Sequence, residues 1–550
     1  MPLLAGQLIL FEGLTRSPVK ITILVSNSRF VFFRGSGSGR GTAGPAGPRD
    51  VVKQAKYTDA HWRARRKPMS TKSLPATRQT SGFEIRLWRR ELVGYPTGGY
   101  RIFLLAIVVL ANIIFTWTVA AGTAATPVMF VHFGMTLNYY ADLLVVAGIC
   151  GGVAAYITSF GDKWGRANMV VVGLLINAVF ALWAVPDAPS KTWFSIFTCI
   201  LYFADGAIFV GTPALVRDFS PQMQRGLAMG FWTLGPVAGY FVLSAVAQAY
   251  LPAVGVTFAN WQQLYRFSGY AAIVMFVICL FLLRELSPGV RSQRMAAMNE
   301  RALVEAKAEG LDLAAMTKNR WRQMLHVNTV LSPIAINLFL VIYFTAIAYF
   351  VFYLPEFLGF SLSSFNGIQE IYWGVNIVAL LVFGFWSDKI MVRKPFMIVG
   401  SIGTIIAIVL LLNAKHGVSF TSMSLILSLL STSLACCYGP WFASFTETLE
   451  SYNPGLIATG SSLYGFATRL VGVPFGLIIP HIVGSPLETA SGWKTWFYIC
   501  IGCVVVFIPF IFTMHGPWRP ATARAEYQAH QARVAEELRR LKTGEPALGN

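Results

Sequence analysis

The sequence predicts an all-α membrane protein: 12 transmembrane helices in two six-helix bundles, related by a parallel pseudo-two-fold repeat. Its 550 residues are 55% hydrophobic and 13% charged, whereas a soluble chain is about 25% charged. Apolar runs of the length needed to cross a bilayer recur along most of the chain. A similar charged motif follows the second run of each half. These three observations predict a duplicated, membrane-spanning unit.

Twelve apolar runs define the expected spans. Those of the N-terminal bundle, within residues 99–285, are 101–121, 141–160, 168–186, 193–214, 227–250 and 267–284. Those of the C-terminal bundle, within 331–515, are 333–354, 369–386, 396–413, 419–445, 458–481 and 494–514. A cytoplasmic central loop, 286–330, and a cytoplasmic tail, 516–550, complete this division. Their composition predicts helices over Arg291–Ala315 and Arg524–Leu541.

The first 98 residues are expected to form a cytoplasmic extension, partly disordered and partly amphipathic. Residues 35–80 are rich in Gly, Ser, Pro and Arg, a composition typical of disorder. Phe83–Leu92 has the spacing of an amphipathic helix on the membrane surface; a solvated tail is the alternative. We leave open whether translation begins at Met1 or at Met69, in which case residues 1–68 are not translated.

The basic residues predict the orientation. With both termini in the cytoplasm, the outer connections carry four Lys or Arg residues and the inner connections and tail carry 21. Because positive residues favour the cytoplasmic side, both termini are expected inside a multi-pass protein of the plasma (inner) membrane. This distribution also accounts for the net charge of +19, so we do not expect a nucleic-acid partner.

The sequence contains no motif typical of an enzyme. The sequence has no Walker loop, His-rich metal cluster or nucleophile–base set. The seven cysteines all fall within apolar runs, which favours packing over disulfides. We therefore expect no enzymatic activity, no cofactor and no metal.

The repeated charged motif lies after the second and the eighth span. The first copy reads Gly161-Asp-Lys-Trp-Gly-Arg166, and the second runs from Gly384 through Asp388 and Lys389 to Arg393 and Lys394. In each copy a carboxylate ends one apolar run and basic residues precede the next. The two halves also share a proline before a glycine-rich span, at Pro221 and Pro454.

These motifs resemble those of the major facilitator superfamily of secondary transporters, over about residues 99–515. The family pattern is Gly-x-x-x-Asp-Arg/Lys-x-Gly-Arg-Arg/Lys, and here Thr158 replaces the first glycine and Ala167 the last base. The segment 217–232 is similar to that of actinobacterial members. The resemblance implies a gate between the halves; membrane anchoring of the basic residues is the alternative. The gate residues would be Asp162, Lys163, Gly165, Arg166, Gly384, Asp388, Lys389 and Arg393.

Two ionisable residues lie at the middle of predicted spans. A charge at the bilayer centre costs roughly 2.5–3.5 kcal/mol, so each must face protein or water. We expect Asp205 to carry the coupling proton, because desolvation raises a carboxyl pKa toward neutrality. Arg469 is expected to anchor an anionic group of the substrate. A structural ion pair or a helix–helix hydrogen bond is the alternative for both.

Further substrate-binding candidates are amide and aromatic side chains in spans expected to border a central cavity. Each one alone is more often a packing residue. Tyr438-Gly-Pro-Trp441 is also expected to break the tenth span. The candidates are Asn112, Trp117, Asn337, Tyr343, Tyr438 and Trp441.

The sequence thus predicts a transporter that moves a small organic solute by alternating access. Proton coupling is expected, an organic anion is one candidate for the solute, and the protein is expected to act as a monomer in the lipid bilayer. Two alternatives remain open: a proton-driven efflux pump for lipophilic compounds, favoured by Gly235-Pro-x-x-Gly239, or a non-transporting scaffold or sensor on the same fold. Substrate, direction of transport and coupling ion are not determined by the sequence.

Overall fold

The computed structural model describes most of the chain beyond residue 89. The described residues are 21–26, 29–34, 90–159, 165–220, 225–291, 327–452, 464, 467–468, 474–484, 490–514 and 516–543. Contacts divide the chain into two units, Met1–Ile85 and Arg86–Asn550. In the first unit, β1 (Ile21–Ser26) and β2 (Arg29–Arg34) pair antiparallel, with Ile21 opposite Arg34.

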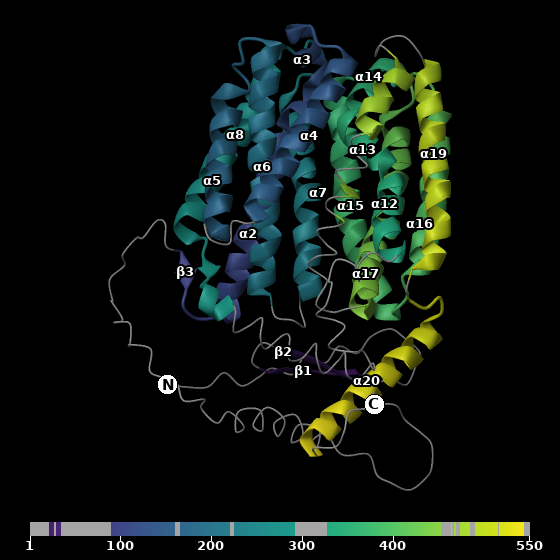
Figure 1. The fold of residues 1–550 in the computed structure, drawn as a ribbon. Helices are drawn as coiled ribbons and strands as arrows, with labels where there is room; N and C mark the ends of the chain where they lie inside the picture. The colour runs from purple at the N-terminus through teal and green to yellow at the C-terminus, as the bar shows by residue number, and fades with distance from the viewer. Residues whose placement is uncertain are drawn as a thin grey trace, which may run out of the picture. The chain divides into compact units, whose positions relative to one another are not determined.

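The second unit contains two groups of helices, which we call the N-half and the C-half (Figure 1). The N-half comprises α2 (Gly98–Ala120), η1 (Ala121–Ala125), α3 (Thr126–Phe133), α4 (Leu137–Ser159), α5 (Arg166–Val179), η3 (Phe180–Ala184), α6 (Lys191–Phe219), α7 (Arg225–Tyr250) and α8 (Phe258–Leu282). The C-half comprises α12 (Val327–Phe339), α13 (Val341–Ala348), α14 (Phe350–Leu358), α15 (Leu362–Ile390), α16 (Lys394–Leu412), α17 (Phe420–Tyr452) and α19 (Ala490–Thr513). The tail forms α20 (Pro520–Thr543), which confirms the helix expected over Arg524–Leu541.

Among the described residues, ten helices are long and apolar enough to cross a membrane, and an eleventh span is a bent pair. The remaining predicted span, 458–481, lies mostly outside the described residues, and its described part includes the apolar helix Pro474–Val483. The predicted central helix Arg291–Ala315 lies outside them too, apart from Arg291.

The sixth span begins earlier than predicted. The prediction placed its start at residue 267, whereas α8 begins at Phe258 after a capping box formed by Thr257 and Asn260. Polar residues in the first turns hide this start from a hydropathy count. One of them, Arg266, forms an ion pair at 2.7 Å with Asp187, in the connection between the third and fourth spans.

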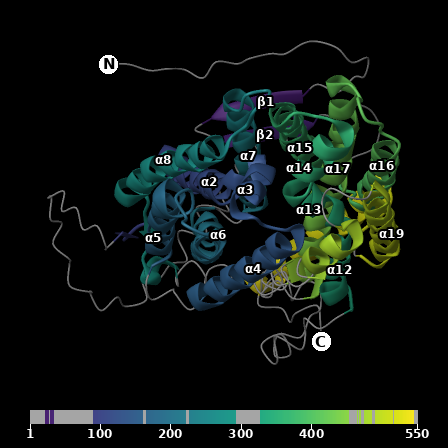
Figure 2. The ribbon, with the colours of Figure 1, turned by 90° about the horizontal axis from the view of Figure 1, so that it is seen from above.

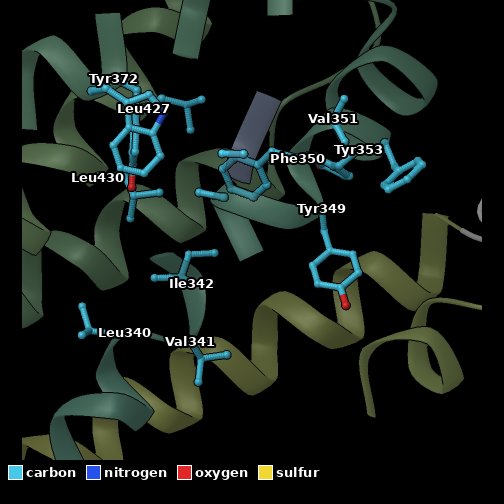
Figure 3. Packing of buried hydrophobic residues seen from close by; sticks show 14 of the residues in the cluster. Leu340, Val341, Ile342, Tyr349, Phe350, Val351, Tyr353, Tyr372, Leu427 and Leu430 are labelled. Atoms are coloured by element: carbon cyan, nitrogen blue, oxygen red, sulfur yellow. The ribbon is translucent and has the colours of Figure 1, made fainter. Parts of the chain in front are cut away.

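The sequence predicted a helix break in the tenth span, and this prediction was wrong. The structure has a break in the seventh span. α17 continues through Pro440, because neighbouring groups in a helical bundle can compensate for the hydrogen bond that proline removes. The seventh span instead bends by 47° between Phe339 and Val341, and breaks again at Tyr349. Figure 3 shows buried apolar side chains of this broken span, among them Leu340, Val341 and Ile342, together with side chains of neighbouring helices.

The two halves meet along a contact that we call the seam, formed chiefly by α7 and α15 (Figures 1 and 2). One cluster of buried apolar residues extends across it, from α3 and α7 to α14 and α15. A second cluster lies within the N-half, among α2, α5, α6 and α8. We call the ends of the spans that hold Arg166 and Arg393 proximal and the opposite ends distal. The first cluster includes the distal ends, and the second lies toward the proximal ends.

Residues 91–92 correct another prediction. Within the predicted amphipathic helix Phe83–Leu92, the structure describes only the last three residues, and Glu91–Leu92 form strand β3. This strand pairs in parallel with β4 (Glu285–Leu286), directly after the sixth span. A two-residue strand has too short a pattern to be read from a sequence, and its partner is almost 200 positions away.

Close helix packing depends on glycine at particular positions. A Cβ at Gly206 on α6 would collide with the backbone oxygen of Gly151 on α4. On α7, a Cβ at Gly235 would collide with Asn112, and one at Gly239 would meet Thr116, both on α2. Small residues allow such close approach between membrane helices. Gly206 therefore fixes the backbone beside Asp205.

The first test compares two glycines within spans. Gly206→Ala should lower stability by about 1–3 kcal/mol, because the added methyl group overpacks the α4–α6 contact. Gly384→Ala is the control, since a Cβ at Gly384 meets nothing within 4 Å. The melting temperature of each purified variant in detergent measures the effect. Equal melting temperatures for both variants would contradict the close contact.

Candidate functional site

Asp205 lies near the middle of α6, half-buried inside the N-half. Its carboxyl is within electrostatic range of Tyr202 on the same helix and of Tyr240 on α7. Tyr240 in turn faces the C-half. The proposed coupling carboxyl thus interacts electrostatically with a side chain that contacts the C-half.

Aromatic rings join the two halves at this level. The rings of Tyr240 on α7 and Trp373 on α15 stack at a centroid distance of 4.9 Å and an interplanar angle of 22°. Tyr343 on α13 meets Trp373 edge-on at 5.5 Å. Of these, the sequence singled out Tyr343 alone. Tyr240 and Trp373 were missed, although the adjacent Gly239 was noted as part of a small-residue motif.

Tyr438 and Trp441 belong to a second aromatic group, inside the C-half. The hydroxyls of Tyr438 and Tyr464 lie 3.0 Å apart. The indole N–H of Trp441 donates to Ser332 Oγ at 3.0 Å, and its ring stacks on Phe445 at 5.3 Å. Trp441 is fully buried. Both residues line up along α17 and connect it to neighbouring spans.

The predicted amides have partners within one half. Asn112 Nδ2 donates to the backbone oxygen of Trp232 at 2.8 Å, joining α2 to α7. Asn337 Nδ2 donates to the backbone oxygen of Pro333 at 2.7 Å, within α12. Trp117 is buried in the large apolar cluster. Binding of a substrate by these three residues stays a prediction. Arg469, Asp162 and Lys163 lie outside the described residues.

The proximal end of the N-half holds a network around the start of α5. Gly165 precedes this helix with φ +89°, and a Cβ there would collide with Glu285 Oε1. The backbone N–H of Arg166 donates to Glu285 Oε2 at 2.7 Å. A carboxylate at a helix N-terminus satisfies a free N–H and complements the helix dipole. Gly165 is thus required by its backbone conformation and by this carboxylate.

Two arginines of this network share one buried carboxylate. Arg166 Nη1 lies 2.9 Å and Arg291 Nε 3.4 Å from Asp218 Oδ2, at the end of α6. Arg291 also reaches Glu285 Oε2 at 3.6 Å. Burial raises the pKa of Glu285, while the Arg166 N–H and Arg291 act in the opposite direction. The network connects the third, fourth and sixth spans.

Arg90 anchors the segment that precedes the first span. It is buried, and it donates to Asn168 Oδ1 at 2.9 Å and to the backbone oxygen of Cys279 at 2.7 Å. The short β3–β4 pairing places this segment beside Glu285. The sequence analysis missed Arg90, Asp218 and Glu285. Glu285 and Arg291 were visible as charges close to the sixth span, but their partners are distant in sequence.

The C-half has a counterpart around Arg393. Arg393 Nη1 lies 2.6 Å from Asp388 Oδ1, and Nη2 lies 2.8 Å from Glu447 Oε1 on α17. Burial alone would lower the pKa of Arg393, but these two carboxylates outweigh it and the pKa is raised. Lys389 lies 6.0 Å from the ring centre of Phe385. No described atom lies within 4 Å of a Cβ built at Gly384, so the described neighbours do not require a glycine there.

Residues 105–477 match the sequence profile of the Major Facilitator Superfamily. The match covers more than half of the chain, which therefore belongs to this family of membrane transporters. Its members are secondary transporters and not enzymes. The actinobacterial affinity stays a prediction.

Two curated relatives illustrate the similarity. The glycine betaine/proline/ectoine/pipecolic acid transporter OusA of Dickeya dadantii (strain 3937) is 23% identical over 416 residues, covering 70% of this chain and 77% of the relative. The alpha-ketoglutarate permease of Bacillus subtilis (strain 168) is 24% identical over 410 residues, covering 70% of this chain and 83% of the relative.

A solved structure agrees with the fold. The crystal structure of a D-xylose–proton symporter superimposes with a TM-score of 0.55 at 15% identity, over 74% of this chain and 97% of the symporter. Together with the family match, this confirms the 12-helix fold predicted from the sequence.

The second test concerns Glu285. Glu285→Ala removes the acceptor for the Arg166 N–H and a partner of Arg291, which should cost about 1–3 kcal/mol of stability. Glu285→Gln keeps an acceptor oxygen and should lose less. Burial raises the pKa of Glu285 in the folded protein above its unfolded value of 4.5. Ionisation therefore destabilises the folded state as pH rises from there through the raised pKa, and the advantage of the wild type over Glu285→Gln should fall in that range. Melting temperatures across pH 5–8 measure both effects, and identical curves for all three proteins would refute the network.

Proposed function

We propose that this protein is a proton-coupled secondary transporter of a small organic solute that carries a carboxylate. It works by alternating access as a monomer in the plasma membrane, with both termini in the cytoplasm. Membership of the family supports secondary transport. Proton coupling and the solute class are our proposals, and they rest on the residues around Asp205 and Arg469.

The observation that carries proton coupling is the position of Asp205. A carboxyl in the middle of a span is costly to ionise unless protein or water compensates it. Asp205 is half-buried, and its nearby aromatic neighbour Tyr240 contacts the opposite half. Protonation of Asp205 therefore changes the charge beside the surface on which the halves must separate. This is the arrangement that links a proton to a movement of the halves.

The solute class rests on Arg469 and on the relatives. Arg469 is a mid-span guanidinium, which suits a carboxylate. The compounds named for OusA include glycine betaine and proline, and the permease is named for alpha-ketoglutarate; all of them carry a carboxylate. A solute with this group would be anchored on the C-half.

The charge networks at the proximal ends are proposed as gates. Each network joins the start of one span to a neighbouring helix of the same half: Arg166 on α5 to Asp218 on α6, and Arg393 beside α16 to Glu447 on α17. These networks lie at the proximal ends of the spans, whereas the contacts between the halves described below lie at the distal ends. This position suits groups that rearrange when one half rocks against the other. The carboxylate–arginine pairs also keep each half rigid, as a rocking movement of one half against the other requires.

The present structure is proposed to represent a state closed at the distal end. Contacts across the seam join distal parts of the spans: Asn366 Nδ2 donates to the backbone oxygen of Ala124 at 2.9 Å, and Ser363 Oγ to that of Gln248 at 3.4 Å. The rings of Phe130 and Phe352 lie 4.8 Å apart. If the protein opens at its distal end, which the proposed orientation places on the extracellular side, these contacts would be lost.

The third test is proton movement in proteoliposomes that contain a pH-sensitive dye. Proline, alpha-ketoglutarate, xylose and a cationic drug are added in turn to the wild type and to Asp205→Asn. A carboxylate solute should move protons with the wild type, and the signal should fall to that of protein-free liposomes with Asp205→Asn. Asp187→Asn is the control, since Asp187 is an exposed aspartate between the third and fourth spans.

The outcomes separate the alternatives. Solute flux that is unchanged in Asp205→Asn would remove Asp205 as the coupling group. Proton movement with the cationic drug alone would favour efflux of lipophilic compounds. No flux of any solute, with a correctly folded protein, would favour a non-transporting scaffold.

A further inference from the structure

The start of α16 holds a lysine whose charge has no contacting anion in the described part of the chain. Lys394 is the first residue of this helix, and it is 6% exposed. Among the described residues its amine forms no hydrogen bond and no ion pair, and the ring of Trp518 lies 5.3 Å away. The carbon chain is buried, but the amine itself still reaches the surface. A cationic side chain that buries its stem and exposes its head is typical of a membrane interface.

The neighbouring charges do not satisfy this amine. Arg393, one residue earlier, is occupied by the carboxylates of Asp388 and Glu447, at 2.6 and 2.8 Å. Glu526 on α20 attracts the amine electrostatically, but it is exposed and forms no ion pair with it. An ammonium group without a contacting anion can gain a charge-assisted hydrogen bond, which is the stronger kind, from an external ligand.

The backbone at the same place also favours an anion. Arg393 is the N-cap of α16, and its side chain makes no capping hydrogen bond. The first turn of a helix has free N–H groups and the positive end of the helix dipole, and both attract negative charge. Because side chains of a helix point toward its N-terminus, the amine of Lys394 lies on the side of these N–H groups.

Exposed aromatic side chains place this amine at the lipid-facing edge of the C-half. Figure 2 shows α16 and α19 on the side of the C-half that is turned away from the N-half. Phe512, near the end of α19, is exposed, and its ring meets Trp518 at 5.0 Å. Phe385 and Trp386, near the end of α15, are exposed as well. Aromatic residues at the ends of spans mark the boundary between bilayer and water, so Lys394 lies at the depth of the lipid headgroups.

The chemistry narrows the ligand to a phosphate ester at the membrane surface. A lysine and the N–H groups of a helix start are donors that suit phosphate. Basic groups between spans bind anionic headgroups on the cytoplasmic side, which the proposed orientation makes the proximal one. A phospholipid also covers Phe512 and Trp518 with its acyl chains, and this apolar contact favours a lipid over a free phosphate.

We propose that Lys394, Trp518 and the first turn of α16 bind the phosphate of an anionic phospholipid in the proximal leaflet. The ammonium group and the N–H groups donate to phosphate oxygens, and the ring of Trp518 lies against the glycerol and the upper acyl chains. Lipid and tail helix compete for one amine, because Glu526 attracts the same charge. The site depends on the position of the chain in a bilayer and not on the transported solute.

The fourth test cross-links lipid to this site in proteoliposomes of phosphatidylcholine. A small fraction of the lipid carries a photoreactive group on its acyl chain, either as anionic phosphatidylglycerol or as phosphatidylcholine, which has the same phosphodiester and no net charge. Mass spectrometry measures the adduct on the peptide that holds Phe512 and Trp518. In the wild type the anionic probe should give about fivefold more adduct than the neutral one, the effect of one lysine at the membrane surface. In Lys394→Gln the two probes should give nearly equal amounts.

Three further variants serve as controls. Lys394→Arg keeps the charge and should keep the preference for the anionic probe. Lys415→Gln removes an exposed lysine beyond the distal end of α16 and should leave the preference unchanged. Glu526→Gln removes the competing carboxylate and should raise the yield of the anionic adduct. The melting temperature of each variant in detergent shows whether it is folded.

An equal preference in the wild type and in Lys394→Gln would overturn the proposal, because the amine would then be hydrated only. An equal loss of preference in Lys415→Gln would overturn it too, since it would indicate a general effect of net charge. Loss of the anionic adduct in excess soluble glycerol phosphate would refute the assignment to a lipid. If Lys394→Gln does not fold, Glu526→Gln decides, because competition requires its yield to rise.

Discussion

The contact between α7 and α15 is the interaction on which the rest of the structure depends. It joins two bundles whose helices also pack among themselves. In the proposed transport cycle, the two surfaces of this contact have to separate. Tyr240 stacks on Trp373 at its centre, and glycines keep the helices close: Gly367 faces Gln248, and Gly374 faces Phe241. Aromatic stacking and van der Waals contact are short-ranged and carry no net charge. Such a surface can be made and broken without uncovering an ion in the bilayer.

Charged groups are placed so that this surface remains free of them. The networks around Arg166 and Arg393 lie at the proximal ends, where they stiffen each half, and each arginine there has a carboxylate partner. Asp205 is the described exception at mid-depth, and it interacts electrostatically with Tyr240, which stacks on the opposite half. The cost of a charge inside a membrane thus explains both the rigid ends and the single site proposed for the proton.

The sequence predicted what depends on local pattern. Length and hydropathy located the spans, and the Gly165-Arg166 and Asp388–Arg393 motifs could be recognised directly in the sequence. Prediction failed where the partner is distant in sequence. Glu285 gains its role from Gly165 and Arg166, about 120 positions earlier, and Lys394 is covered only because Trp518 returns to it after the last span. The prediction of a break at Pro440 in the tenth span was wrong because a helix can continue through a proline. The bend that does occur, at Leu340, is not at a proline.

The central claim is that the halves separate at the distal end in response to the proton and the solute. Double electron–electron resonance between spin labels at Val254 and Lys415, exposed distal positions of the N-half and the C-half, tests it most directly. We predict two distance populations, the shorter matching the closed distal end, whose ratio changes with pH in the wild type and is insensitive to pH in Asp205→Asn. One distance that changes neither with pH nor with solute would contradict the account.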